Sequence, residues 1–264
     1  MMFLDINAWL GHYPWRQLRH NDAPSLVALM DQVGIDRAVV SSIDAIYYNN
    51  PQPGNEQLYA ETKLYPGRLI PFGTINPTYA GWERDLAICH EEWGMQGLRA
   101  FPVHHGYTLN DKSCQALLAA AAERHLPVAF AARLVDRRQH HWMDTTTDLD
   151  LALLASTVVS HPNNQFIILN SLAPASTWAA LAGSQVLFDI SRMTTLDIAL
   201  SPKSFNIPAL CQAIGIQHLA FGSGIPFSVP HAAMLKMSTL RADEATKNAI
   251  SSANAAQMLR LNIT

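Results

Sequence analysis

The stretch QFIILN at residues 165–170 shows the pattern that decides the fold of this chain. Its side chains are largely apolar and do not alternate with polar ones. Such a run is typical of a strand that is buried on both faces of a parallel sheet. Eight runs of this kind recur along the 264 residues. They are MFLDIN (2–7), RAVVSSI (37–43), LIPFGTIN (69–76), MQGLRAF (95–101), PVAFAAR (127–133), QFIILN itself, VLFDIS (186–191) and HLAFGS (218–223).

The stretches between these runs have the apolar spacing of helices. In residues 24–34, Pro24 suits a first helical turn and Gly34 suits a C-cap. Residues 78–93, 111–125 and 242–261 are predicted to be helical from similar patterns. Eight strand–helix units in a chain of this length predict an α/β fold, a (β/α)8 TIM barrel formed by residues 1–264 as one domain. The alternative is a doubly wound open sheet, but the first strand is not followed by a Gly-rich phosphate loop.

Composition narrows the expected partners and location. With 49% hydrophobic residues, 15% charged residues and a net charge of −3, the chain is not expected to bind nucleic acid or an anionic membrane surface. No run of about 20 apolar residues predicts a membrane-spanning helix. The three cysteines are far apart, and the N-terminus does not resemble a signal peptide, so a cytoplasmic location is expected. The oligomeric state stays open, with a homo-oligomer as one alternative.

The expected functional face is the rim formed by the C-terminal ends of the strands and the loops that follow them. The loops after the fourth and fifth strands carry His104, His105, His140 and His141 together with several arginines. Arginine binds carboxylates in a two-point fashion, and histidine exchanges protons near neutral pH. The rim therefore predicts a small, anionic, oxygen-rich ligand. Other expected rim residues are Tyr13, Tyr47, Tyr107 and Asp144.

Each rim residue could instead have a purely structural role, such as pairing with a neighbouring side chain. Arg99 could pair with a neighbouring carboxylate instead of a ligand. Because adjacent side chains point apart, at most one of His104 and His105 is expected to face the pocket. Asp189 could be a general base or a metal ligand, or it could hold an arginine. The run DRRQHHWMD (136–144) could be a loop that covers the barrel or an oligomer contact.

An ordered set of motifs covers nearly the whole chain. They are LDINAWLG (4–11), LYPGRLIPFGTINP (64–77), WGMQGLRAFP (93–102), HLPVAFAAR (125–133), FIILNSL (166–172), FGSGIPF (221–227) and SSANAAQMLRL (251–261). In this order they resemble the amidohydrolase superfamily, specifically the amidohydrolase-related branch that includes decarboxylases and lactonases. In that family the first motif reads D-x-H-x-H-x-G, and its two histidines bind a catalytic metal.

The metal ligands of this family are not kept. The five positions correspond here to Asn7, Trp9, Ala131, Asn170 and Gly224. Because neutral and apolar residues at these positions cannot hold a divalent ion, the resemblance implies a barrel without the family metal and without another cofactor. A relocated metal site is an alternative, with one histidine from each pair and Asp136 or Asp189 as ligands.

The resemblance leads to two functional hypotheses. The first is a metal-independent hydrolase of esters, lactones or amides, or a decarboxylase, that acts on a small carboxylate-bearing molecule by acid–base chemistry. Its predicted catalytic residues are His104, His105, His140, His141 and Asp189. Its predicted substrate-binding residues are Asn7, Trp9, Arg99, Arg133, Asn170 and Ser223. The second hypothesis is a catalytically inactive barrel that binds a ligand or acts as a scaffold. Convergence of the histidines with Arg99 and Asp189 in one pocket would favour the first.

Overall fold

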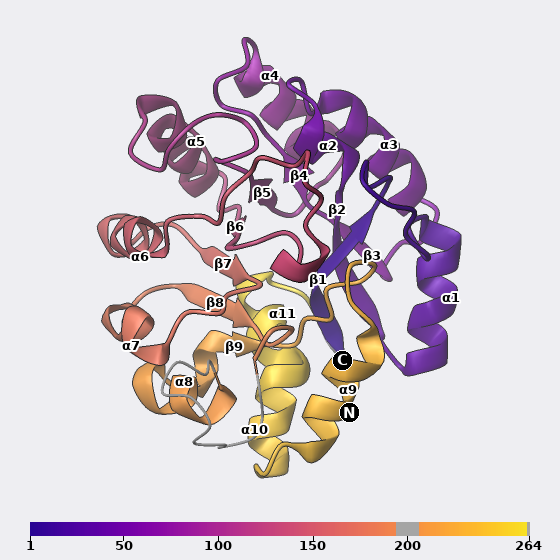
Figure 1. Cartoon of the computed structure of the whole chain (residues 1–264), viewed down its shortest axis with the longest axis vertical. Helices are drawn as coiled ribbons and strands as arrows, with labels where there is room; N and C mark the ends of the chain where they lie inside the picture. The colour runs from indigo at the N-terminus through magenta and orange to yellow at the C-terminus, as the bar shows by residue number, and fades with distance from the viewer. Residues whose placement is uncertain (194–205, 263–264) are drawn as a thin grey trace.

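The computed structural model describes residues 1–193 and 206–262. Its centre is made of parallel strands at eight places around a barrel, one of which is shared by the two short strands β3 and β4. The strands are β1 (Leu4–Leu10), β2 (Arg37–Ser42), β3 (Leu69–Pro71), β4 (Gly73–Thr74), β5 (Leu98–Ala100), β6 (Val128–Ala131), β7 (Phe166–Leu169), β8 (Val186–Asp189) and β9 (Leu219–Ala220). Seven of the eight apolar runs contain their strands, and the third contains both β3 and β4. The first run, predicted to end at residue 7, is too short, because β1 continues to Leu10. Figure 1 shows the strands surrounded by helices.

Hydrogen bonds close these strands into a ring. The strands β1 to β3 form one sheet and β4 to β9 form another. Between β3 and β4, the N–H of Phe72 donates to the Val40 carbonyl at 2.8 Å, so the two short strands act as one. On the other side, the N–H of Ile6 donates to the Phe221 carbonyl at 3.0 Å, which joins β1 to the segment after β9. The predicted (β/α)8 barrel is confirmed, and the open-sheet alternative is excluded.

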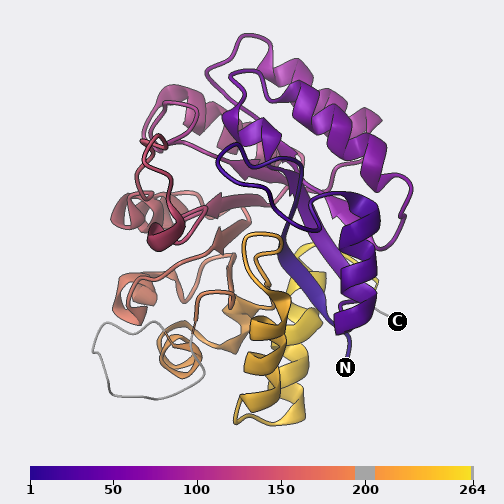
Figure 2. The ribbon, with the colours of Figure 1, turned by 45° about the vertical axis from the view of Figure 1, so that its right-hand side comes forward.

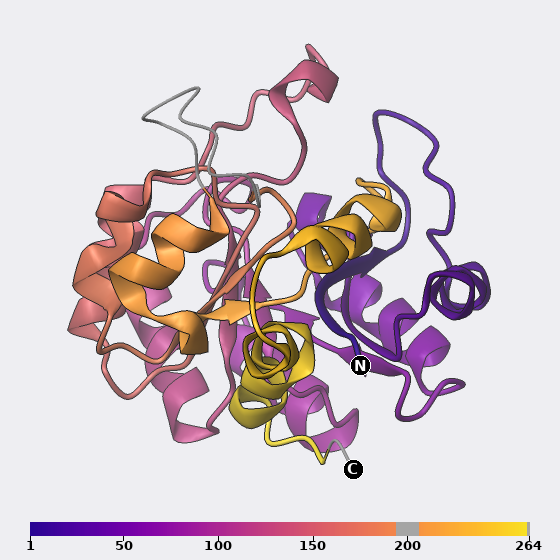
Figure 3. The ribbon, with the colours of Figure 1, turned by 90° about the horizontal axis from the view of Figure 1, so that it is seen from below.

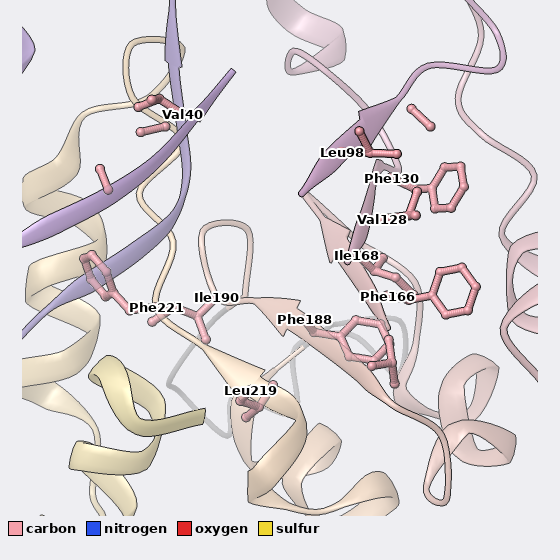
Figure 4. Close-up of a cluster of buried hydrophobic side chains, with 14 of the residues drawn as sticks. Val40, Leu98, Val128, Phe130, Phe166, Ile168, Phe188, Ile190, Leu219 and Phe221 are labelled. Carbon is pink, nitrogen blue, oxygen red and sulfur yellow. The ribbon is translucent and has the colours of Figure 1, made fainter. Parts of the chain in front are cut away.

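The strand side chains alternate between two buried layers. Phe130, Phe166 and Phe188 lie in the layer between the strands and the helices, as Figure 4 shows. Ala129 and Ile167, one position away, lie in the cluster inside the barrel. All five side chains are buried. Because both faces of the sheet are covered by a hydrophobic layer, β6 and β7 consist of apolar residues only.

Helices cover the outside of the barrel. They are α1 (Ala23–Val33), α2 (Asp44–Tyr47), α3 (Gln52–Thr62), α4 (Trp82–Ala87), α5 (Lys112–Glu123), α6 (Leu151–Ser160), α7 (Ala175–Trp178), α8 (Ile207–Ile214), α9 (Pro230–Thr239), α10 (Glu244–Asn248) and α11 (Asn254–Met258). The π-helical turns η1 (Ile88–Glu92) and η5 (Ala249–Ala253) extend α4 and join α10 to α11. Gly34 ends α1 with a φ of 82°, as its sequence predicts. No helix within the described ranges is long and apolar enough to cross a membrane.

The two ends of the barrel differ in what covers them. At the N-terminal end of the strands, Ala255, Ala256 and Leu259 of the C-terminal helical segment pack in one cluster with Leu4 and Ile6. Figure 2 shows this segment, in yellow, beside β1. The loop between β1 and α1 and the loop between β6 and α6 (residues 132–150, the β6 loop) project from the opposite end (Figure 3). That end therefore carries the candidate site.

Candidate active site

A network of buried polar side chains fills the centre of the barrel mouth. The amide nitrogen of Asn7 donates to Oδ1 of Asn170 at 3.0 Å and to Oδ2 of Asp189 at 2.9 Å. The indole N–H of Trp9 donates to Oδ1 of Asn7 at 2.8 Å. Asp189 also accepts from the backbone N–H groups of Asn170 at 2.6 Å and Ser191 at 3.1 Å. These five residues, the barrel-centre network, satisfy one another's hydrogen bonds.

A second buried carboxylate lies beside this network. Asp5 accepts from the backbone N–H groups of Asn7 at 2.8 Å and Ser223 at 3.0 Å, and the hydroxyl of Ser223 also donates to it. Burial raises the pKa of Asp5 to about 6, although the hydrogen bonds from Ser223 act in the opposite direction. The substrate-binding role expected for Ser223 stays a prediction. In this structure its hydroxyl holds Asp5.

Arg99 lies inside the barrel, and only 1% of its surface is exposed. Its guanidinium carbon is 4.0 Å from the centroid of the Trp9 ring. Its nitrogens donate to the carbonyls of Ala8 at 2.9 Å, Ile6 at 3.1 Å and Val39 at 3.1 Å. Burial lowers the pKa of Arg99 to about 9, which still leaves it protonated at neutral pH. These contacts indicate a structural role, and carboxylate binding by Arg99 stays a prediction.

The resemblance assigns five positions to metal ligands, and a divalent ion would bind there only if their side chains fit it. The side-chain oxygen of Asn170 already accepts from the amide nitrogen of Asn7 and from the Ser191 hydroxyl. The nitrogen of Asn7 is a donor that already faces two acceptors, and the indole of Trp9 can only donate. Ala131 and Gly224 have no ligand atoms in their side chains. In residues 1–193 and 206–262, no group of three or more His, Cys, Asp or Glu side chains could hold a metal ion elsewhere.

A pocket opens between the segment that follows β5 and the β6 loop. Its ionisable lining residues are His104, Arg133, Arg137, His140, Asp144 and Asp148. Phe101, Leu134 and Leu149 are among its apolar lining residues. We call this site the loop pocket. Arg99 and Asp189 are not among the described residues that line it. Two of the predicted histidines share this pocket with Arg133, but the convergence with Arg99 and Asp189 that would favour the metal-independent enzyme is not found among the described residues.

His104 provides an imidazole without a hydrogen-bond partner at one nitrogen. Its Nε2 is buried and has no partner among the residues that the structure describes. Burial lowers the pKa of His104 to about 4, while the nearby Asp144 raises it and His140 lowers it. At neutral pH the ring is therefore uncharged and can take up a proton. The adjacent His105 faces Ala45 instead, since its ring nitrogen Nε2 donates to that carbonyl at 3.2 Å.

The two other predicted histidines have different surroundings. Nε2 of His140 lies 3.5 Å from Oδ2 of Asp144, and Asp144 accepts from the N–H of Thr146 at 3.0 Å. His140 therefore has a carboxylate beside it that can orient its ring. His141 stacks on Trp15, with ring centroids 4.9 Å apart. This contact connects the β6 loop to the loop after β1.

The arginines of the loop pocket share one carboxylate. Arg133 donates from Nε to Oδ1 of Asp148 at 2.7 Å, and its Nη2 donates to Oδ2 of the same group. Arg137 donates to that carboxylate at 2.5 Å. Hydrogen bonds from Arg133 lower the pKa of Asp148, which keeps it ionised. Asp144 also lines the pocket, so its two arginines are balanced by two carboxylates, and the arginines are the groups that could bind an anionic ligand.

Sequence reasoning placed Tyr13, Tyr47 and Asp144 on the rim without giving them a role, and it did not consider Trp15. In the structure, the Tyr47 ring meets the His104 ring edge to face with centroids 5.5 Å apart. The one available signal was position, because all four residues follow a strand. Which of them share a pocket depends on how the loops fold over the barrel mouth.

Comparisons with known proteins come from a family model and from solved structures. A family model described as amidohydrolase matches residues 26–261. No curated protein matches the chain. The 2,6-dihydroxybenzoate decarboxylase from Rhizobium has a similar structure, with a TM-score of 0.74, 13% identity, and 98% of each chain covered.

Two further structures have the same fold. A 5-carboxyvanillate decarboxylase from Novosphingobium aromaticivorans, complexed with manganese and 4-hydroxy-3-methoxy-5-nitrobenzoic acid, has a TM-score of 0.74 and 15% identity, with 98% of this chain and 96% of that chain covered. A probable 2-pyrone-4,6-dicarboxylic acid hydrolase from Acinetobacter baumannii with citric acid bound has a TM-score of 0.69 and 14% identity, with 99% and 100% covered. At these identities the likeness shows the fold.

Proposed function

We propose, because this chain belongs to the amidohydrolase family, that it is a hydrolase or decarboxylase of a small carboxylate-bearing molecule. The reaction would take place in the loop pocket by acid–base chemistry, without a divalent metal. The observation that carries the proposal is the buried Nε2 of His104, which has no partner among the described residues and lies in a pocket with His140 and Arg133. Structures of similar fold contain 2,6-dihydroxybenzoate and citric acid, which are small carboxylates.

We assign the two histidines of the pocket different roles, one as general base and the other as general acid. His104 is uncharged at neutral pH because burial lowers its pKa to about 4, so it is in the form that accepts a proton, and the position of its unpartnered Nε2 in the pocket, not its basicity, assigns it the role of general base. His140 has Asp144 beside it, so it suits the group that carries a proton. In hydrolysis, His104 would take a proton from the attacking water, and His140 would give one to the leaving oxygen. In decarboxylation, His140 would supply the proton that replaces carbon dioxide on carbon.

The carboxylate of the ligand would be held by an arginine of the β6 loop. The fork of Arg133 is occupied by Asp148, so Arg133 would contribute charge. The side chain of Arg137 is 75% exposed, and its contact with Asp148 uses one nitrogen, so its other donors can reach a ligand. The catalytic role expected for Asp189 stays a prediction. The substrate-binding roles expected for Asn7, Trp9 and Asn170 also stay predictions. In this proposal their network fixes the strand ends behind the pocket.

Binding and turnover test the proposal separately. Phenylacetate is the binding probe, and a panel of small carboxylate-bearing esters, lactones and benzoic acids is the activity screen. We expect phenylacetate to bind protein treated with a chelator, and Arg137→Gln to weaken this binding about tenfold, the value of one charge-assisted hydrogen bond. We expect His104→Gln to keep binding but to lose turnover of any substrate that the screen identifies.

A matched control is His12→Gln, because the His12 side chain is 78% exposed on a rim loop and does not line the loop pocket. This variant should behave like the wild type. Turnover that requires an added metal, or that survives His104→Gln, would refute the proposed mechanism. Binding without turnover of any panel compound would favour the inactive ligand-binding barrel instead.

A further inference from the structure

A carboxylate of the chain itself occupies an arginine of the loop pocket. Oδ1 of Asp148 accepts from Nε of Arg133 at 2.7 Å, and Oδ2 accepts from Nη2 of the same guanidinium. Oδ2 also accepts from Arg137 at 2.5 Å. The two-point contact with Arg133 is the geometry in which a guanidinium binds any carboxylate. Asp148 therefore lies where the carboxylate of a ligand in this pocket would make its strongest contact.

The backbone on both sides of this contact is held by other hydrogen bonds. The side-chain amide of Asn170, which belongs to the barrel-centre network, donates to the carbonyl of Arg133 at 3.0 Å. The N–H of Leu149, the residue after Asp148, donates to the carbonyl of Ala132 at 3.1 Å. Because these two bonds do not involve the carboxylate of Asp148, its departure would leave the guanidinium anchored at the edge of the pocket.

The side chain of Asp148 lies beside water. It is 30% exposed, and the side chain of Arg133 is 20% exposed. A rotation of the Asp148 side chain is enough to break the two-point contact, and water can then solvate the freed carboxylate. Both residues line the loop pocket, so the two N–H groups of Arg133 that Asp148 releases would be open to a ligand there.

An internal carboxylate makes the site selective for anions. Hydrogen bonds from Arg133 lower the pKa of Asp148, so this carboxylate is ionised and competes with a ligand at neutral pH. A ligand carboxylate replaces the bonds that Asp148 gives up with bonds of the same kind. A neutral amide or ester oxygen forms weaker bonds to a guanidinium and would not compensate for the loss.

We infer that the ligand's carboxylate takes the place of Asp148 on the Nε and Nη2 groups of Arg133, so that Asp148 is an internal competitor that restricts the loop pocket to anions. This inference rests on the proposed function, in which the exposed Arg137 binds the ligand. Arg137 would make the first contact, and the carboxylate would then displace Asp148 into water. The exchange changes hydrogen bonds only, and no covalent bond forms or breaks.

The first test weakens the competitor. Asp148→Asn keeps the shape of the side chain but removes its charge, so this variant should bind phenylacetate about tenfold more tightly than the wild type. Asp136→Asn is the matched control. Asp136 lies on the same loop, pairs with Arg138 and Arg192, and is not among the described residues that line the pocket. Its affinity should equal that of the wild type. A purely structural ion pair predicts the opposite, and unchanged or weaker binding by folded Asp148→Asn would overturn the inference.

The second test separates exchange at Arg133 from a general loss of negative charge. Arg133→Gln removes the guanidinium that the two carboxylates share, so adding Asp148→Asn to this variant should no longer improve phenylacetate binding. If Asp148→Asn improves binding by the same factor with and without Arg133, the gain comes from reduced repulsion, and exchange at Arg133 is refuted.

The third test follows the exchange in the wild type by NMR of the side-chain carboxyl carbons. Saturation with phenylacetate should move the ¹³C resonance of Asp148 towards its position in ligand-free Arg133→Gln, because both states lack the two-point contact. The resonance of Asp136 should stay in place. An Asp148 resonance that does not move at saturation would overturn the inference.

The two proposals fail in different ways. If neither the wild type nor Asp148→Asn binds phenylacetate, the loop pocket is not a carboxylate site and both proposals fail. If the wild type binds phenylacetate and Arg137→Gln weakens this binding, but Asp148→Asn brings no gain, only the exchange at Arg133 is refuted and the proposed function stands.

Discussion

Replacement of Arg99 by methionine separates the structural role of this residue from its expected role in ligand binding. The variant leaves the carbonyls of Ile6, Ala8 and Val39 without a side-chain donor and removes the contact with the Trp9 ring at 4.0 Å. Three hydrogen bonds at about 1 kcal/mol each, and a buried cation–π contact of about 1–2 kcal/mol, give about 4–5 kcal/mol. Part of this loss is offset, because the variant no longer buries a charged group. We therefore expect the free energy of unfolding to fall by about 3 kcal/mol. This is the lower end of the range for removing one member of a buried charged pair.

Urea denaturation followed by circular dichroism measures this loss. Arg138→Met is the matched control because the Arg138 side chain is 88% exposed and pairs with Asp136 at the surface, so its removal should not change stability measurably. Phenylacetate affinity is measured for both variants at a temperature where they are folded. If Arg99→Met changes the free energy of unfolding by less than about 1 kcal/mol but abolishes phenylacetate binding, Arg99 binds the ligand, as the sequence alone predicts, and the structural interpretation is wrong.

Two further predictions concern pH and the β6 loop. Burial lowers the pKa of His105 to about 4, whereas an unfolded histidine titrates near 6.5, so the unfolded state binds this proton first and stability is lost between about pH 6.5 and 4. His105→Leu should reduce the pH dependence of urea unfolding by up to about 3 kcal/mol, and an unchanged dependence would contradict this. His141→Ala removes the stacking on Trp15, so trypsin should cut the β6 loop at Arg137 and Arg138 several-fold faster, and equal cleavage rates would show that this contact does not hold the loop.

The fold could be predicted from the sequence because it depends on local patterns. The run at residues 165–170 is apolar throughout, and its strand has core on both faces. The buried position of Arg99 could also be predicted from the sequence. In the sheet, Arg99 pairs with Ala129, whose side chain lies inside the barrel, so the alternation along β5 turns Arg99 inward as well.

The candidate site could be predicted only in part, because its contacts depend on the path of loops. Alternation correctly separates His104, which lines the pocket, from His105, which does not. Arg133, however, meets Asp148, which lies 15 positions further along the β6 loop, and no periodic pattern fixes such a contact.

The most direct test of the account follows the histidine side chains during ligand binding. Protein labelled with ¹⁵N in its histidine rings is treated with a chelator and titrated with phenylacetate while NMR spectra are recorded. The account predicts that the ring nitrogens of His104 and His140 shift together and saturate at one Kd, without added metal. Unshifted resonances of both histidines, or shifts that occur only after manganese is added, would contradict a metal-independent site in the loop pocket.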